Sequence, residues 1–135
     1  MKPYLTYYKK HQIIPAVRVN SKNYNILTKQ RNNLFNQLKI DKKLFKNSNV
    51  LEVGPGTGYN GKYLINSGVK KITLVDGNTS SINSIKKTFN NVNKNKYKII
   101  NKDFHNLKLK KKFDFVICEN VISGVSNPNL FLKKL

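Results

Sequence analysis

The sequence predicts a doubly wound α/β domain with a mainly parallel sheet. Three observations indicate this fold class. From residue 49 onward, short apolar segments alternate with segments of helical spacing. The apolar segments lack a polar face, which is typical of parallel strands that helices cover on both sides. The first apolar segment runs straight into Gly54, Gly56 and Gly58, a loop whose bare backbone lets a nucleotide-like ligand approach closely.

The first 48 residues are expected to form an N-terminal segment beside an α/β domain of residues 49–135. Residues 1–20 are aromatic-rich and contain two prolines, so we expect irregular structure there. Residues 22–39 carry apolar side chains at roughly helical spacing and predict a helix. We expect a lid over the ligand site from Tyr7, Tyr8, His11 and the 22–39 helix.

The α/β domain is expected to contain four strands and three helices. The strands are predicted from apolar runs at 50–53, 71–75, 97–101 and 113–118. The helices are predicted at 59–67, ending at Gly68; from a cap in Thr79-Ser80-Ser81 to about Phe89; and from Asn127-Pro128 onward. Because right-handed crossovers bring the carboxyl ends of parallel strands to one edge, we expect the ligand site at that edge.

The chain is strongly basic, with 26 Lys and Arg against six Asp and Glu among 135 residues and a formal net charge of +20. A basic surface is typical of proteins that bind nucleic acid. However, only Arg18 and Arg31 are arginines, and the lysines are spread through nearly every segment. Base and phosphate recognition favours the bidentate guanidinium of arginine. The lysines therefore fit a compositional bias better, and RNA binding is a disfavoured alternative.

We expect a cytoplasmic protein without a membrane segment. The N-terminus leads into no apolar signal region, and no stretch approaches about 18 consecutive apolar residues. The single cysteine, Cys118, lies in an apolar run and has no intramolecular partner for a disulfide, which favours a reducing compartment. No His/Cys/Asp cluster has metal-ligand spacing, so we expect no metal.

Five of the six acids are expected at strand ends: Glu52, Asp76, Asp103, Asp114 and Glu119. Such acids can simply cap helices or balance nearby lysines. In a chain with so few acids, their grouping favours a common ligand site instead. Glu52 is the most unusual, because a carboxylate inside an apolar strand is costly unless it is paired. It is expected to order the glycine loop or to face a cationic ligand.

Two ligands compete for the glycine loop. Gly56, Gly58 and Gly61 match the letters of a dinucleotide fingerprint, but that match begins two residues late and leaves Glu52 unexplained. A pyrophosphate would also be repelled by a carboxylate beside its loop. S-adenosylmethionine carries a sulfonium cation and an amino group instead of a phosphate, so a nearby acid favours its binding.

The segment Val50-Leu51-Glu52-Val53-Gly54-Pro55-Gly56-Thr57-Gly58 resembles the glycine motif of the class I methyltransferases, including its acid. The resemblance covers about residues 49–135 and implies a Rossmann-like fold with S-adenosylmethionine as cofactor. It places Asp76, followed by Gly77, against the ribose hydroxyls. It places Asp103 against the adenine amino group and Phe104 against the ring. The cofactor residues that it implies are Glu52, Gly54, Pro55, Gly56, Gly58, Asp76, Gly77, Asp103, Phe104 and Glu119.

The resemblance also implies a place for the methyl acceptor, just beyond the fourth strand. Glu119 and Asn120 lie there, and Glu119 would orient the methionine end, act as a base or cap a helix. His105 is a further candidate base. Cys118-Glu119-Asn120-Val121 departs from the Asn/Asp-Pro-Pro-Tyr/Phe motif of members that methylate amino groups of bases or glutamine. Gly124 stands where many small-molecule members have a histidine.

We therefore expect an S-adenosylmethionine-dependent methyltransferase that acts on a small-molecule or sugar hydroxyl. A non-catalytic cofactor-binding subunit and an RNA methyltransferase are the alternatives. The family sheet usually has seven strands and this chain supplies four, so the fold is expected to be truncated after the fourth strand. That strand would then be an exposed edge through which the chain could self-associate.

Overall fold

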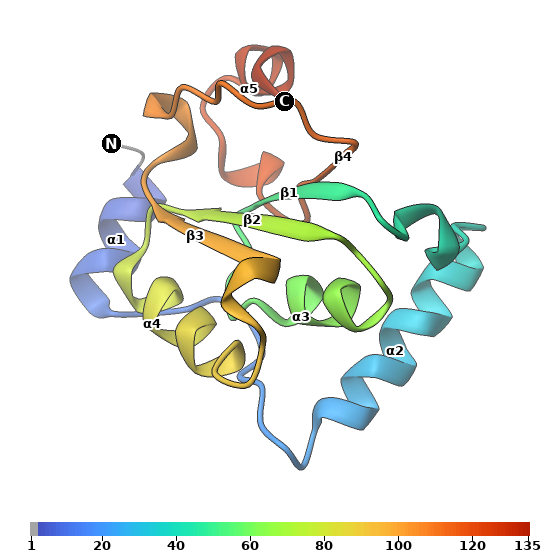
Figure 1. Cartoon of the computed structure of the whole chain (residues 1–135). Helices are drawn as coiled ribbons and strands as arrows, with labels where there is room; N and C mark the ends of the chain where they lie inside the picture. Colours follow the sequence, from blue (N-terminus) through green and yellow to red (C-terminus); the bar gives the residue numbers. More distant parts are fainter. Residues whose placement is uncertain (1–2) are drawn as a thin grey trace.

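The computed structural model describes residues 3–135 and confirms the doubly wound α/β fold (Figure 1). The strands are β1 (Asn49–Val53), β2 (Lys71–Asp76), β3 (Tyr97–Asn101) and β4 (Phe115–Ile117). The α-helices are α1 (Pro3–His11), α2 (Tyr24–Gln37), α3 (Tyr59–Asn66), α4 (Thr79–Thr88) and α5 (Pro128–Lys134). Short 3₁₀ turns are η1 (Lys42–Phe45), η2 (Lys94–Lys96), η3 (Phe104–Asn106) and η4 (Ile122–Gly124).

All four strands are parallel and lie in the order β3-β2-β1-β4. The chain moves outward from β1 through β2 to β3, and then crosses back to place β4 on the other side of β1. The loops after β1 and β4 therefore diverge, which opens a crevice at the carboxyl edge of the sheet. Glu52 lies at the centre of this sheet, opposite Leu74 on one side and Ile117 on the other.

Apolar clusters cover both faces of the sheet, as parallel strands require. On one face, α3 and α4 contribute buried side chains such as Tyr63, Leu64 and Ile85, and Phe89 follows α4 directly. On the other face, Phe104 of η3 and Phe131 of α5 contact each other edge to face and belong to one apolar cluster with Leu51, Val53 and Val75 of the strands. In Figure 1, α3 and α4 lie below the sheet and α5 lies above it.

The structure corrects three element predictions. Residues 3–11 form a helix instead of irregular structure, because Tyr4 and Tyr8 lie one helical turn apart and share a face. The cap of α4 is Asn78, whose side chain accepts a hydrogen bond from the Ser80 amide, so the Thr-Ser-Ser run already lies inside the helix. The fourth strand is limited to residues 115–117.

Asp114 is also placed differently from the other acids. It precedes β4 and accepts a hydrogen bond from the Asn49 amide at 2.6 Å, at the amino end of β1. This is the edge of the sheet opposite to the glycine loop. Asp114 therefore links the starts of two strands and does not belong to the ligand edge.

The remaining elements agree with the sequence. Helix α3 ends before Gly68, whose φ of +98° is the left-handed conformation typical of a residue after a helix. Asn127 caps α5 by accepting from the Leu130 amide at 3.0 Å, with Pro128 in the first turn. In the part of the chain that the structure describes, none of the helices has the length and apolar character that crossing a membrane requires.

Candidate functional site

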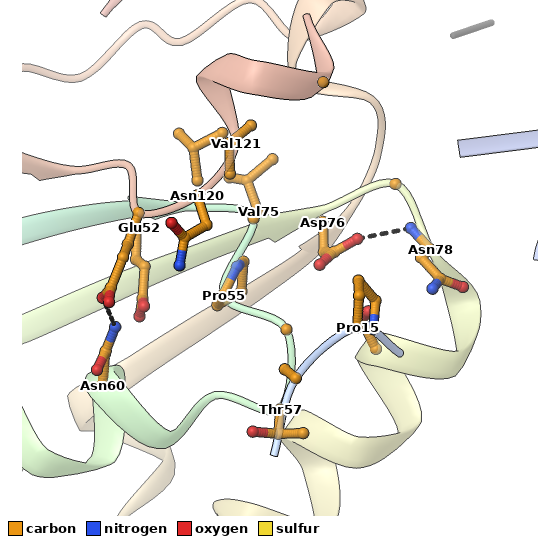
Figure 2. Close-up of a pocket in the computed structure, with 18 of the residues that line it drawn as sticks. Pro15, Glu52, Pro55, Thr57, Asn60, Val75, Asp76, Asn78, Asn120 and Val121 are labelled. Atoms are coloured by element: carbon orange, nitrogen blue, oxygen red, sulfur yellow. Dashed lines mark hydrogen bonds between the residues drawn. The ribbon is translucent and has the colours of Figure 1, made fainter. Parts of the chain in front are cut away.

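A cavity of about 600 Å³ lies at the carboxyl edge of the sheet. Loops after all four strands line it, together with α1, α2 and the segment 15–17. Figure 2 shows Pro55, Asp76 and Asn120 around the same space. Of the residues predicted from sequence, those that line it are Glu52, Gly54, Pro55, Gly56, Asp76, Gly77, Asp103, Phe104, His105, Glu119 and Asn120. A volume of this size is typical of a small-molecule or cofactor site.

The three glycines of the loop contact different parts of the structure. Gly54 has a φ of +68°, and a Cβ there would lie 2.4 Å from Val121 Cγ2. Gly56 has a φ of +55°, and its Cβ would lie 2.8 Å from that of Ala16. Gly58 is not among the residues that line the cavity, because it faces Ile85 and Phe89 and starts α3. The side chains of Val121 and Ala16 therefore lie close to the backbone at Gly54 and Gly56, whereas Gly58 allows α3 and α4 to pack closely.

Replacing Gly54 with alanine should lower the free energy of unfolding by about 2 to 3 kcal/mol, because left-handed strain and a clash with Val121 add together. Gly68→Ala is a matched control. Gly68 is also left-handed, but the nearest atom to its Cβ would lie 3.5 Å away. Urea denaturation of both variants separates the clash from the strain. Equal losses would show that contact with Val121 does not restrict this position.

Glu52 is buried in β1 with 2% of its surface exposed. Burial raises its pKa from 4.5 to about 8, although the nearby Asn60 opposes the rise. Its Oε2 atom is fully buried and has no hydrogen-bond partner among the described residues. The lack of a side chain at Gly61 makes room for it, since a Cβ there would lie 3.1 Å from Oε2. Glu52 is therefore protonated at neutral pH, with hydrogen-bonding capacity left over.

Asp76 is the last residue of β2, and Asp103 lies two residues after the end of β3. Each accepts a hydrogen bond from the amide two residues later, Asp76 from Asn78 at 2.7 Å and Asp103 from His105 at 2.9 Å. Figure 2 marks the first of these bonds. Burial raises the pKa of Asp76 to about 6, and the bond from the Asn78 amide opposes that rise. Both acids thus shape their own turns while lining the cavity.

Glu119 is held by two side chains that sequence analysis did not select. Arg31 of α2 donates from Nη1 to Glu119 Oε2 at 2.9 Å and from Nη2 to Oε1 at 3.4 Å. Asn60 of α3 donates from Nδ2 to Oε2 at 2.7 Å. Both carboxylate oxygens of Glu119 are thus already engaged by side chains of α2 and α3. The only sequence signal for Arg31 was that it is one of two arginines.

The two other candidate catalytic residues also line the cavity. Asn120 has a φ of +56°, a conformation that Asn tolerates better than most residues. His105 packs its ring against Phe131, with ring centroids 5.6 Å apart. Its backbone carbonyl accepts a hydrogen bond from Lys134 Nζ at 2.5 Å. His105 is thus anchored to α5 while it faces the cavity.

The N-terminal segment closes the cavity from outside. Residues 13–17, which we term the strap, are bound to both walls. Thr57 Oγ1 donates to the Val17 carbonyl at 2.9 Å, and Asn78 Nδ2 donates to the Ile13 carbonyl at 2.8 Å. Sequence reasoning missed Thr57 and Asn78 because both bonds join segments more than 35 residues apart.

Helices α1 and α2 continue this cover on either side of the strap. Tyr4, Leu5 and Tyr8 of α1 line the cavity, and a Cβ at Gly77 would lie 2.7 Å from Leu5 Cδ2. Tyr7 and His11, which were expected in the lid wall, do not line it. Their rings pack against each other at 4.5 Å, and Tyr7 is 54% exposed. Of the three predicted lid side chains in residues 1–20, only Tyr8 reaches the cavity.

These residues fit a nucleoside cofactor. The loop at Gly54 and Gly56 leaves its backbone bare where any Cβ would collide, and Asp76 offers a carboxylate two strands away from Glu119. The buried Glu52 oxygen without a partner provides a further acceptor. Within residues 3–135, no group of three or more His, Cys, Asp or Glu side chains could hold a metal ion.

A parallel sheet with a glycine loop after β1 and acids after β2 and β3 is shared by Rossmann-like folds that bind nucleoside cofactors, and the class I S-adenosylmethionine-dependent methyltransferases are one such class. A family model described as "Methyltransferase domain" matches residues 51–135, and the chain belongs to this family. No curated protein matches the chain in sequence.

Solved structures with the same fold include three from different organisms. The Trypanosoma brucei PRMT1 enzyme-prozyme complex with AdoHcy is 24% identical with a TM-score of 0.58, over 85% of this chain and 33% of that one. A suggested RNA methyltransferase of Pyrococcus horikoshii is 19% identical with a TM-score of 0.60, over 90% and 57%. A suggested S-adenosyl-L-methionine-dependent methyltransferase of Methanococcus maripaludis is 16% identical with a TM-score of 0.63, over 84% and 49%. The chain thus spans one third to somewhat over half of these proteins.

Proposed function

We propose that this chain binds S-adenosylmethionine in the cavity and transfers its methyl group to a hydroxyl of a small molecule or sugar. The main support for this proposal is that the glycine loop, Asp76 and Asp103 line one cavity at the carboxyl edge of the sheet. When bound, the cofactor supplies an electrophilic methyl group on a sulfonium. The chain then has to hold the acceptor oxygen in line with that methyl group and to exclude water.

Each residue is assigned to a part of the cofactor or acceptor according to its position in the cavity. Asp76 accepts hydrogen bonds from the ribose hydroxyls, and Asp103 with Phe104 holds the adenine. The loop of Gly54, Pro55 and Gly56 carries the methionine end, with Glu52 beneath it. Residues 1–48, described from residue 3, act as the lid over the domain of residues 49–135. The acceptor lies near Glu119 and Asn120, and His105 is the remaining candidate base because Glu119 is ion-paired.

Two further proposals concern partners. Strand β4 is an edge of the sheet, and its Val116 is 37% exposed, so we propose that this edge supports association with a second copy or another partner. The alternative function is a non-catalytic cofactor-binding subunit. The enzyme-prozyme pairing named for the Trypanosoma brucei complex provides an analogy for such a subunit.

Calorimetric titration with S-adenosylhomocysteine, followed by a methyl-transfer assay with labelled S-adenosylmethionine, tests the proposal. Saturable one-to-one binding with turnover on a hydroxyl acceptor is the expected result. Binding without turnover on any acceptor would favour the non-catalytic subunit. Absence of binding would refute the cofactor assignment. RNA affinity that falls steeply with salt, together with methylated RNA as product, would favour the RNA alternative.

A further inference from the structure

The turn η3 and the residue before it carry the two side chains that the proposed function assigns to the adenine. Asp103 precedes the turn and Phe104 begins it. Hydrogen bonds within this segment fix its shape. The Asp103 side chain accepts from the His105 amide at 2.9 Å, and the Asp103 carbonyl accepts from the Asn106 amide at 3.0 Å. Because these bonds join neighbours in the chain, the position of the turn at the cavity depends on contacts with other elements.

Helix α5 supplies such contacts through one lysine. Lys134 Nζ donates to the His105 carbonyl at 2.5 Å and also lies 5.3 Å from the centre of the Phe104 ring. One ammonium group thus contacts two consecutive residues of η3. Phe131, three residues earlier on α5, contacts the same two residues, with its ring centroid 5.3 Å from that of Phe104 and 5.6 Å from that of His105. Lys134 and Phe131 together hold η3 against α5.

The environment of Lys134 differs from that of the lysines near it in the chain. Its side chain is half-buried, whereas Lys133 and Lys112 are exposed. Phe104 and Phe131 are only 5% and 1% exposed. Hydrogen bonds from a charged donor and cation–π contacts are stronger where water is partly excluded. Lys134 therefore restrains η3 more firmly than an exposed lysine would.

Lys134 acts on the cavity from behind its wall. Asp103, Phe104, His105 and Phe131 line the cavity, whereas Lys134 is not among the residues that line it. Its effect on a bound cofactor would thus pass through η3. An amino group needs its acceptor within hydrogen-bond distance and in good alignment, so a small displacement of η3 would weaken the bond to adenine.

We propose that Lys134 is a positioning residue for adenine recognition. By holding η3 against α5, it keeps the Asp103 carboxylate where it accepts a hydrogen bond from the adenine amino group. This inference rests on the proposed function and adds α5 to the elements that select the cofactor.

Calorimetric titration with two matched ligands tests the proposal. The ligands are S-adenosylhomocysteine and its analogue with purine in place of adenine, which lacks only the 6-amino group. The wild type should prefer S-adenosylhomocysteine roughly tenfold or more, the effect of one hydrogen bond to a charged acceptor. Lys134→Met removes the charge and the donor but keeps an unbranched side chain. It should weaken binding of S-adenosylhomocysteine several-fold more than binding of the analogue, so the preference falls.

Two further variants complete the comparison. Lys133→Met is the matched control, because Lys133 is the exposed neighbour on the same helix, and it should keep the wild-type preference. Lys134→Arg retains a cationic donor and should restore most of the preference. Thermal unfolding of each variant confirms that it is folded before binding is measured.

The outcomes separate this inference from the proposed function. Failure of S-adenosylhomocysteine to bind the wild type would refute the proposed function itself. If it binds, the inference is overturned when the wild type does not distinguish the two ligands, or when Lys134→Met weakens both equally or neither. Equal weakening would show that Lys134 only stabilises the fold. Should Lys134→Met not fold, Lys134→Gln, which keeps a donor but places no charge over Phe104, decides by the same ratio.

Discussion

Replacing Glu52 with glutamine should make folding stability much less dependent on pH between about pH 4.5 and 8. In the wild type, burial raises the pKa of Glu52 from 4.5 to about 8. Below pH 4.5 the carboxyl is protonated in both the folded and unfolded chain, so its titration does not disfavour folding. As pH rises, the unfolded chain loses the proton first and gains relative stability, until the folded form ionises near pH 8. The full difference corresponds to about 5 kcal/mol.

Glutamine has the shape of the protonated acid and does not titrate. Urea denaturation from pH 4.5 to 8.5 should therefore give a variant that is progressively more stable than the wild type as pH rises. Some slope should remain below pH 6, because the pKa of Asp76 is also raised, from 3.8 to about 6. Asp41→Asn, at an exposed acid that caps η1, is the control. Parallel profiles for Glu52→Gln and the wild type would show that Glu52 is ionised in the folded chain.

Replacing Asp76 with alanine should weaken S-adenosylmethionine binding tenfold or more, roughly the effect of losing a charge-assisted hydrogen bond. Asp76 is partly buried in the cavity wall, so water cannot easily replace its carboxylate. The same carboxylate gives a second expectation. Because hydroxyl donors bind the ionised form more strongly, cofactor affinity of the wild type should fall as the pH drops below about 6. Calorimetric titration at pH 5 and pH 8 measures both effects.

Asp114→Ala provides the control for this comparison. Asp114 is bound to the Asn49 amide at the opposite edge of the sheet, so its loss should leave cofactor affinity unchanged. Unchanged affinity in Asp76→Ala would mean that the ribose does not lie at the end of β2. A decrease in both variants would indicate a general loss of folded structure.

The sequence predicted the central strands and the ligand edge because both follow from local patterns. The run from Val50 to Val53 is continuously apolar apart from Glu52, and only a buried parallel strand suits such a run. Once the strands are parallel, Asp76 and Asp103 must lie at one edge beside Gly54. Most residues of the candidate site therefore follow from the local sequence pattern alone.

The contacts missed from sequence depend on pairing over long separations. Arg31 and Glu119 are 88 residues apart, and nothing in the local pattern of α2 shows which of its polar residues faces inward. Asn78 illustrates a second reason. It stands directly before three residues that are good caps themselves, and its own capping role depends on where β2 ends at Asp76. The motif position of Gly58 likewise does not show that a Cβ there would meet Ile85 and Phe89 instead of the cavity.

The strap has a kinetic consequence. It is fastened on both sides of the crevice, by Thr57 from the glycine loop and by Asn78 from the start of α4. The strap covers one side of a nucleoside bound beneath it, so opening either fastening should ease exchange of that nucleoside with solvent. We therefore expect the spent cofactor to have a long residence time, and its departure to limit the rate of repeated turnover. Weakening the strap should then speed up multiple turnovers while slowing the first one.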